Sequence, residues 1–192
     1  MAAYKHFKGQ RITTDGSDTA DRAFLAHVAY SAEEAAAADA DGIATLELEA
    51  EAQEITEDLE ALPGLRNLTV VADSADVSGT VKITGLNAAG EEIEESFTVA
   101  GTTAQTGTKI FKSVTKVELP AGTEGDSILI GWGSKLGIPY KLAHDTILAA
   151  YVNNTRETDP YSLTCSAEAL ESNGVTLDTV PAGTPVDIYL IV

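Results

Sequence analysis

Two loops contain the residue types of a ligand site. Residues 101–109 (Gly-Thr-Thr-Ala-Gln-Thr-Gly-Thr-Lys) combine two glycines with a lysine, the ingredients of a phosphate-binding loop. The glycine spacing differs from that of such a loop, and no Gly-Lys-Ser/Thr sequence follows. Residues 39–42 (Asp-Ala-Asp-Gly) begin like a calcium loop, but the glycine comes too early and residues 44–50 contain no Asp or Asn. We therefore expect no nucleotide site at residues 101–109, and at residues 39–42 a turn with an incidental weak cation.

The histidines and the single cysteine form no catalytic or metal-binding pattern. His6, His27 and His144 are far apart and have no His-x-x-x-His spacing. Cys165 alone excludes an intramolecular disulfide and a cysteine metal cage, and the alternation of residues 161–167 favours a buried small hydrophobe over a nucleophile. No Gly-x-Ser-x-Gly elbow is present. The sequence therefore predicts no catalytic residue, no cofactor and no metal, in a protein that is not an enzyme.

Trp132 is the one tryptophan, and it lies between two glycines. A large aromatic side chain in this setting can be a platform for a ligand or an anchor at an interface. We favour a role in the core or at an interface.

The charge of the chain limits its partners. Its 192 residues include 30 acidic and 12 basic ones, for a formal net charge of −18, and the lysines are scattered singly. A nucleic-acid backbone would be repelled. Residues 1–6 (Met-Ala-Ala-Tyr-Lys-His) have no apolar core behind them, so we do not expect a signal peptide, and no stretch of about 18 apolar residues predicts a membrane span. We expect a protein made in a cytoplasm that binds neither nucleic acid nor membrane. The acidic excess also fits a saline environment.

Residues 1–42 differ from the rest and are predicted to be an extended N-terminal arm. The polar run at residues 13–21 cannot bury enough apolar surface to offset its ordering entropy. Ser31 and Glu34 have capping-box spacing ahead of four alanines, which predicts a short helix that Gly42 ends. The expected anchors of this arm on a neighbouring subunit are Arg22, Phe24, Leu25, Val28 and Tyr30. The alternative is that the apolar four pack into the core of their own chain.

Residues 43–192 have the period of β-strands. Apolar residues alternate with acidic ones over residues 45–53, and residues 87–90 (Asn-Ala-Ala-Gly) are typical of a hairpin loop. Further strands are expected at residues 68–71, 77–84, 93–99, 109–119, 127–132, 146–152, 161–167 and 186–191. Many short strands with regular turns predict a mainly β protein, a β-sandwich or jelly-roll-like domain.

Several sequence segments, taken in order, resemble a known family. They are Arg-Asn-Leu-Thr-Val at 66–70, the module of residues 81–114, Lys-Leu-Gly-Ile-Pro-Tyr at 135–140, residues 148–155 and Pro-Val-Asp-Ile-Tyr at 185–189. Residues 43–192 thereby resemble small virion structural proteins of tailed viruses of bacteria and archaea (Caudoviricetes). The acidic N-terminal region has no counterpart in this likeness.

The resemblance implies a non-enzymatic role in a virion. The expected function is that of a capsid decoration (head cement) protein, a homotrimer that binds the major capsid protein on the exterior of the expanded shell. It would stabilise the shell by bridging neighbouring subunits. A tail-tube or head-completion protein, which forms closed rings, is the first alternative. A carbohydrate-binding β-sandwich with Trp132 and the tyrosines as stacking residues is the second.

Overall fold

The computed structural model describes residues 12–13, 19–20, 23–158 and 161–192. The regular secondary structure of these residues is almost entirely β-strand. This confirms the prediction of a mainly β, sandwich-like fold. The elements are β1 (Ile12–Thr13), β2 (Thr19–Ala20), β3 (Leu25–Tyr30), β4 (Asp39–Glu47), β5 (Gln53–Ile55), β6 (Arg66–Ala72), β7 (Ser78–Leu86), β8 (Glu92–Ala100), β9 (Gln105–Phe111), β10 (Ser113–Leu119), β11 (Ser127–Gly137), β12 (Ile147–Val152), β13 (Thr155–Arg156), β14 (Ser162–Thr164), the 3-10 helix η1 (Leu170–Ser172), β15 (Gly174–Thr176) and β16 (Val186–Ile191).

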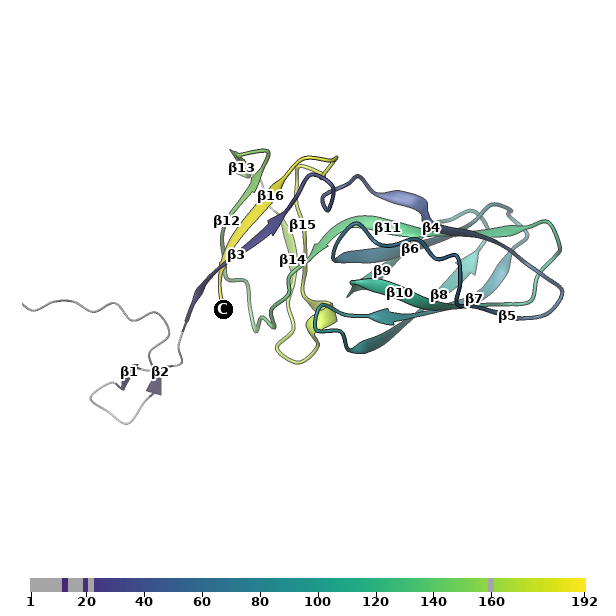
Figure 1. Cartoon of the computed structure of the whole chain (residues 1–192), viewed down its shortest axis with the longest axis horizontal. Coiled ribbons are helices and arrows are strands. Elements are labelled where there is room, and N and C mark those ends of the chain that lie inside the picture. The colour runs from purple at the N-terminus through teal and green to yellow at the C-terminus, as the bar shows by residue number, and fades with distance from the viewer. Residues whose placement is uncertain (1–11, 14–18, 21–22, 159–160) are drawn as a thin grey trace, which may run out of the picture.

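The strands form two lobes that share one long sheet (Figure 1). β11 is the link, because its first part pairs with β4 and its last residues pair with β15, while β6 runs along its other side. One lobe contains the sheet β5-β10-β7-β8, here called the charged sheet. The other contains β13-β12-β16-β3, here called the C-terminal sheet. Each lobe has its own apolar core.

Local sequence accounts for the β7–β8 hairpin. The side-chain oxygen of Asn87 accepts hydrogen bonds from the backbone N–H groups of Ala89 and Glu91, and Gly90 has a φ of +81°. Asn and Gly are the residues that tolerate such a turn. The predicted hairpin at residues 87–90 is confirmed.

Two of the predicted strands are each divided in the structure. The alternating segment at 45–53 is split, because β4 covers Asp39–Glu47 and the chain turns before β5. The run at 109–119 is divided into β9 and β10 at Lys112, whose backbone N–H bonds to the carbonyl of Leu86. Periodicity alone missed both corners. Alternation continues through the first one, whereas the adjacent apolar residues Ile110 and Phe111 interrupt it at the second.

The predicted boundary between an arm of residues 1–42 and a domain of residues 43–192 is wrong. β3 pairs with β16 over its full length, from Leu25 opposite Ile191 to Tyr30 opposite Val186. The side chains of Ala26, Val28 and Tyr30 are buried in the core of the C-terminal lobe. Their period-two spacing marks a half-buried strand, but the polar run before it hid this signal.

The predicted short helix is also absent. Ser31 and Glu34 do form the reciprocal hydrogen bonds of a capping box. Only one turn follows, closed by the N–H of Ala35 on the carbonyl of Ser31. The carbonyls of Glu34 and Ala36, which a helix would use, instead accept hydrogen bonds from the Arg66 guanidinium. Gly42 lies inside β4 and does not end a helix.

Arg66 lies at the junction of the two cores. It is opposite Phe111 on β9 and Leu136 on β11, so the three side chains share one face of the sheet. Phe111 belongs to one core and Leu136 to the other. The fully buried guanidinium donates to the carbonyls of Gly133 (3.1 Å), Glu34 (3.0 Å) and Ala36 (2.6 Å). It therefore joins the 31–36 turn to the shared sheet.

We expect Arg66→Met to lower the free energy of unfolding by roughly 2–4 kcal/mol, because it leaves buried carbonyls without donors. Arg66→Lys should recover less than half, since one ammonium cannot replace a planar fork that reaches three carbonyls. Urea denaturation followed by circular dichroism measures both, with exposed Arg156→Met as the control. A loss for Arg66→Met no greater than that of the control would contradict this role.

We also expect a chain that starts at Gly42 to lose the fold of the C-terminal lobe, because β16 and its core would be uncovered. A chain that starts at Ala23 retains β3 and should stay folded. Near-ultraviolet circular dichroism and proteolysis compare the two. Equal folding of both chains would show that β3 is dispensable and would restore the arm hypothesis.

Candidate functional site

The outer face of the C-terminal sheet is the strongest candidate for a binding surface. Strand pairing arranges its side chains in three rows across β3, β16 and β12. They are Leu25 and Ile191 in the first row, His27, Tyr189 and Ala149 in the second, and Ala29, Asp187 and Tyr151 in the third. Exposed Leu148 lies at the irregularity of β12 between Ile147 and Ala149. Asp187 is the one carboxylate among these residues, and Arg156 of β13 lies beside Tyr151. The face is therefore apolar and aromatic on an otherwise acidic molecule.

The aromatic side chains of this face support one another. The rings of His27 and Tyr189 are stacked, with centroids 4.5 Å apart, and Tyr151 meets Tyr189 edge-on at 6.0 Å. Nε2 of His27 lies 2.7 Å from Oδ1 of Asp187. Cross-strand aromatic pairs of this kind stiffen a sheet. The stacked contact also occupies one face of the His27 ring and one face of the Tyr189 ring, which a sugar would need for stacking.

A shallow hollow of about 270 Å³ opens beside this cluster, lined by Tyr151, Asn154, Asp187 and Tyr189. Asn154 is placed there by the tight β12–β13 turn, in which Asn153 and Asn154 have φ values of +48° and +61°. Two asparagines with positive φ form a two-residue hairpin turn. Asn-Asn between two alternating runs was the sequence signal for this turn, and sequence analysis did not use it.

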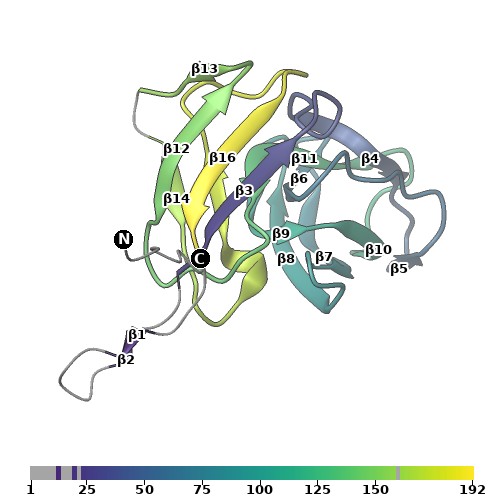
Figure 2. The same cartoon turned by 60° about the vertical axis from the view of Figure 1, so that its left-hand side comes forward.

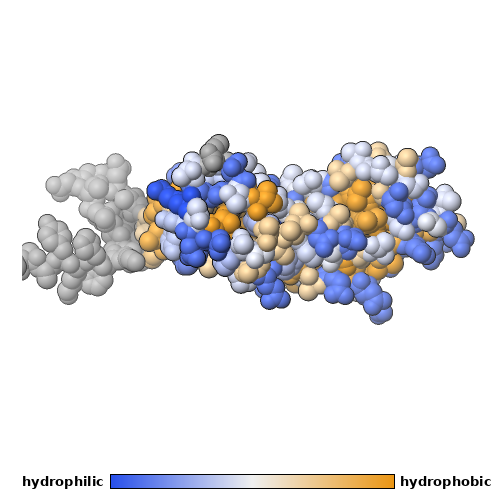
Figure 3. Space-filling view, turned by 90° about the horizontal axis from the view of Figure 1, so that it is seen from above, coloured by the Kyte–Doolittle hydropathy of each residue, from blue (hydrophilic) through white to orange (hydrophobic). Residues whose placement is uncertain are grey.

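Exposed apolar side chains gather at the end of the face where β3 begins. Phe24 is 45% exposed, Leu25 52% and Leu148 55%. Figure 3 shows apolar surface beside the grey residues at this end of the molecule. Clustered exposed apolar side chains on a soluble domain are typical of interaction sites.

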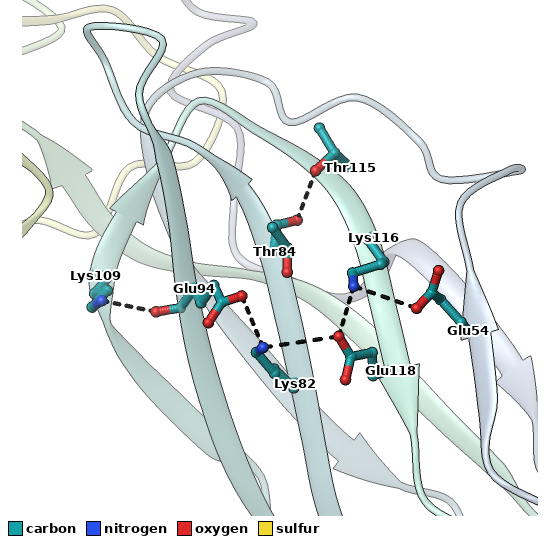
Figure 4. Close-up of polar contacts among 8 residues, drawn as sticks. All are labelled: Glu54, Lys82, Thr84, Glu94, Lys109, Thr115, Lys116 and Glu118. Carbon is teal, nitrogen blue, oxygen red and sulfur yellow. Dashed lines mark hydrogen bonds and ion pairs between the residues drawn. The ribbon is translucent and has the colours of Figure 1, made fainter.

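The charged sheet has a contrasting outer face (Figure 4). Lys82 pairs with Glu94 at 2.8 Å, and Lys116 pairs with Glu118 at 2.8 Å and Glu54 at 3.4 Å. The hydrogen bond from Lys116 lowers the pKa of Glu118, and the one to Glu94 raises the pKa of Lys82. These pairs are solvent-exposed and screened. The ion pairs of this face are therefore part of a solvated surface.

The predicted interface residues fall into three groups. Arg22 lies outside the described residues. Val28 and Tyr30 are buried in their own core, so their prediction as anchors on a neighbour is wrong. Phe24 and Leu25 are exposed and lie at the candidate face.

Trp132 has an intramolecular role. Its Nε1 donates to the carbonyl of Ala37 at 2.9 Å, and its ring lies against Gly42, where any Cβ would collide with it. It packs against the larger core. Of the two roles favoured from the sequence, the structure therefore shows the core one.

Tyr30 and Arg66 are the pair that sequence reasoning missed. The Tyr30 hydroxyl donates to the carbonyl of Gly137. Burial raises the pKa of Tyr30, and burial lowers the pKa of Arg66. Nothing in sequence spacing connects two residues 36 positions apart on different sheets.

The remaining sequence candidates form no site. Within the part of the chain that the structure describes, no group of three or more His, Cys, Asp or Glu residues could hold a metal ion. His144 is exposed, and His6 lies outside the described residues. The segment at 101–109 runs from a turn, where Gly101 has a φ of +63°, into strand β9. Residues 39–42 are part of β4 rather than the predicted turn.

Three comparisons with known proteins found no similar protein. No family model, no curated protein and no solved structure matches the chain. Among the described residues, no helix is long and apolar enough to cross a membrane.

We expect Cys165 to react slowly with iodoacetamide at pH 8. Burial raises the pKa of its thiol, and the Asp145 carboxylate adds to this, so less of the reactive thiolate is present. Asp145→Asn should increase the rate, and unfolding in urea should increase it further. Intact-mass kinetics measure all three, and a native rate equal to that in urea would contradict the shift.

Proposed function

We propose that this chain is a non-enzymatic virion structural protein of the capsid decoration type. Its C-terminal sheet docks on the outer surface of an expanded shell, and the protein bridges neighbouring major capsid subunits as a homotrimer. The observation that carries the proposal is the outer face described above, which is apolar and aromatic on a molecule with a net charge of −18.

Docking through this face would bury apolar side chains and leave the charged sheet in water. Docking through this face removes Leu25 and Leu148 from water and requires little desolvation of charge, since Asp187 is already paired with His27. The charged sheet, with its ion pairs exposed, stays in solvent and keeps particles apart. A ligand that binds only the expanded lattice stabilises it by mass action.

The stacked aromatic rings favour this function over sugar binding. Tyr189 is stacked on His27, and the ring of Trp132 lies against Gly42, so one face of each ring is already occupied. A carbohydrate-binding protein would instead bind its sugar in the hollow at Tyr151 and Asn154.

The decisive experiment is electron cryomicroscopy of particles that contain this chain. Density on the exterior of the head, bridging capsid subunits, is the expected result. A ring in the tail or at the head vertex would instead identify a tail-tube or head-completion protein. Light scattering with size exclusion should give about three times the 20.0 kDa chain mass. A monomer at micromolar concentration would contradict the trimer.

We expect Leu148→Asp to abolish binding to expanded shells in a sedimentation assay, because it places a charge among the exposed apolar side chains of this face. Val180→Asp is the matched control, since Val180 is 56% exposed against 55% for Leu148 but lies in the loop before β16. The control should bind like the parent chain. Equal binding by the Leu148 variant would show that another surface docks.

A further inference from the structure

β3 has an edge with no partner among the described residues. The N–H and C=O of Phe24 both bond to Val192. Hydrogen-bonded pairs alternate along an antiparallel ladder, so Ala26, Val28 and Tyr30 also bond toward β16. The backbone groups of Leu25, His27 and Ala29 therefore point away from the sheet, ready to pair with another strand.

The other long edge strands are protected, and β3 is not. β4 and β8 carry several acidic residues each, and on β9 the Glu95 carboxylate accepts the N–H groups of Thr108 and Lys109. The edge strands β5, β13 and β14 have three residues or fewer. β3 has six residues (Leu-Ala-His-Val-Ala-Tyr) and no lysine, acid or proline. A bare edge of this kind is normally covered.

The space beside this edge suits a single extended segment. Figures 1 and 2 both show β3 as the strand of its sheet that faces the larger lobe. Between them lies a hollow of about 440 Å³, lined by Val28, Ala29 and Tyr30 on one side and by Leu62, Leu65 and Pro139 among others. A second sheet would meet the larger lobe, whereas one strand would lie along the hollow.

The pairing of β1 with β2 indicates which segment reaches the edge. Ile12 is opposite Ala20 and Thr13 is opposite Thr19. β2 leads into β3 after four residues. If the same register continues, each step back from Ile12 matches a step forward from Ala20. Residues 2–7 then lie opposite residues 30–25, which covers the whole of β3.

We propose that residues 2–7 of the same chain add to the C-terminal sheet as a fifth strand, antiparallel to β3. Paired residues share a face, so Tyr4 lies beside Val28 on the side of the hollow, and Phe7 covers exposed Leu25. Lys5 comes beside His27, next to Asp187. The inference is independent of the proposed function.

The charge of the segment fits this place. Residues 1–11 contain three of the twelve basic residues and none of the thirty acidic ones. A basic, aromatic segment is attracted to the acidic remainder of the chain. The added strand closes the bare edge and widens the outer face with Phe7, Lys5 and Ala3.

Disulfide trapping tests the register. Ala3→Cys with Ala29→Cys, in a Cys165→Ser background, places two cysteines in a hydrogen-bonded pair, where Cα atoms about 5.5 Å apart suit a disulfide. Ala2→Cys with Ala29→Cys is the matched control, because a one-residue shift puts the side chains on opposite faces. Under mild oxidation the first pair should form an intramolecular disulfide in most molecules, and the control in few.

Three results would overturn the proposal: no disulfide in either variant, equal yields in both, or disulfide-linked dimers, which would mean that a second copy occupies the edge. Hydrogen exchange on the unaltered chain is the second measurement. The amides of Leu25, His27 and Ala29 should be protected, and deletion of residues 2–7 should remove that protection while Ala26, Val28 and Tyr30 keep theirs. Unprotected Leu25, His27 and Ala29 amides in the full chain would also overturn it.

Discussion

The buried guanidinium of Arg66 is the interaction on which the arrangement of the two lobes depends. Among the described residues no carboxylate pairs with it, and its charge is met by the carbonyls of Glu34, Ala36 and Gly133, while its Nε has no hydrogen-bond partner. A buried charge is costly unless its hydrogen bonds are satisfied, so the 31–36 turn must stay on the shared sheet. That turn directly follows β3. Holding it in place therefore fixes where β3 enters the C-terminal sheet, and with it the outer face that we propose as the docking surface.

The acidic excess is distributed so that the two outer faces differ. On the charged sheet, each lysine lies among glutamates, and all of these side chains remain in contact with water. On the C-terminal sheet, aromatic and aliphatic side chains take the equivalent positions. Moving paired charges out of water returns little energy, whereas burying apolar area is favourable. These differences are the reason we propose the C-terminal sheet, and not the charged sheet, as the docking surface.

Strand edges are handled individually in this fold. Glu95 of β8 accepts two backbone N–H groups of β9, and so connects the charged sheet to the shared sheet while blocking an edge. β4 relies on acidic residues at the solvent side. The edge of β3 has neither a covering carboxylate nor acidic residues of its own. We therefore propose that the basic segment at the start of the chain covers it. Charged residues protect the other long strand edges, so the uncharged edge of β3 is the one at which we propose that another strand pairs.

The sequence by itself determined the β class, the hairpin at residues 87–90 and most of the strands, because alternation and turn residues are local signals. It did not determine that Val28 and Tyr30 enter the core, since the polar residues before β3 outweighed a short alternating run. Nor did it predict that the Ser31–Glu34 capping box would end after one turn, because the competing donor, Arg66, is 30 residues away. The aromatic face likewise depends on the register of β16 with β12 and with β3, which is more than 100 residues before either strand in the sequence. Only the tertiary structure decides which distant backbone and side-chain groups compete for the same partner.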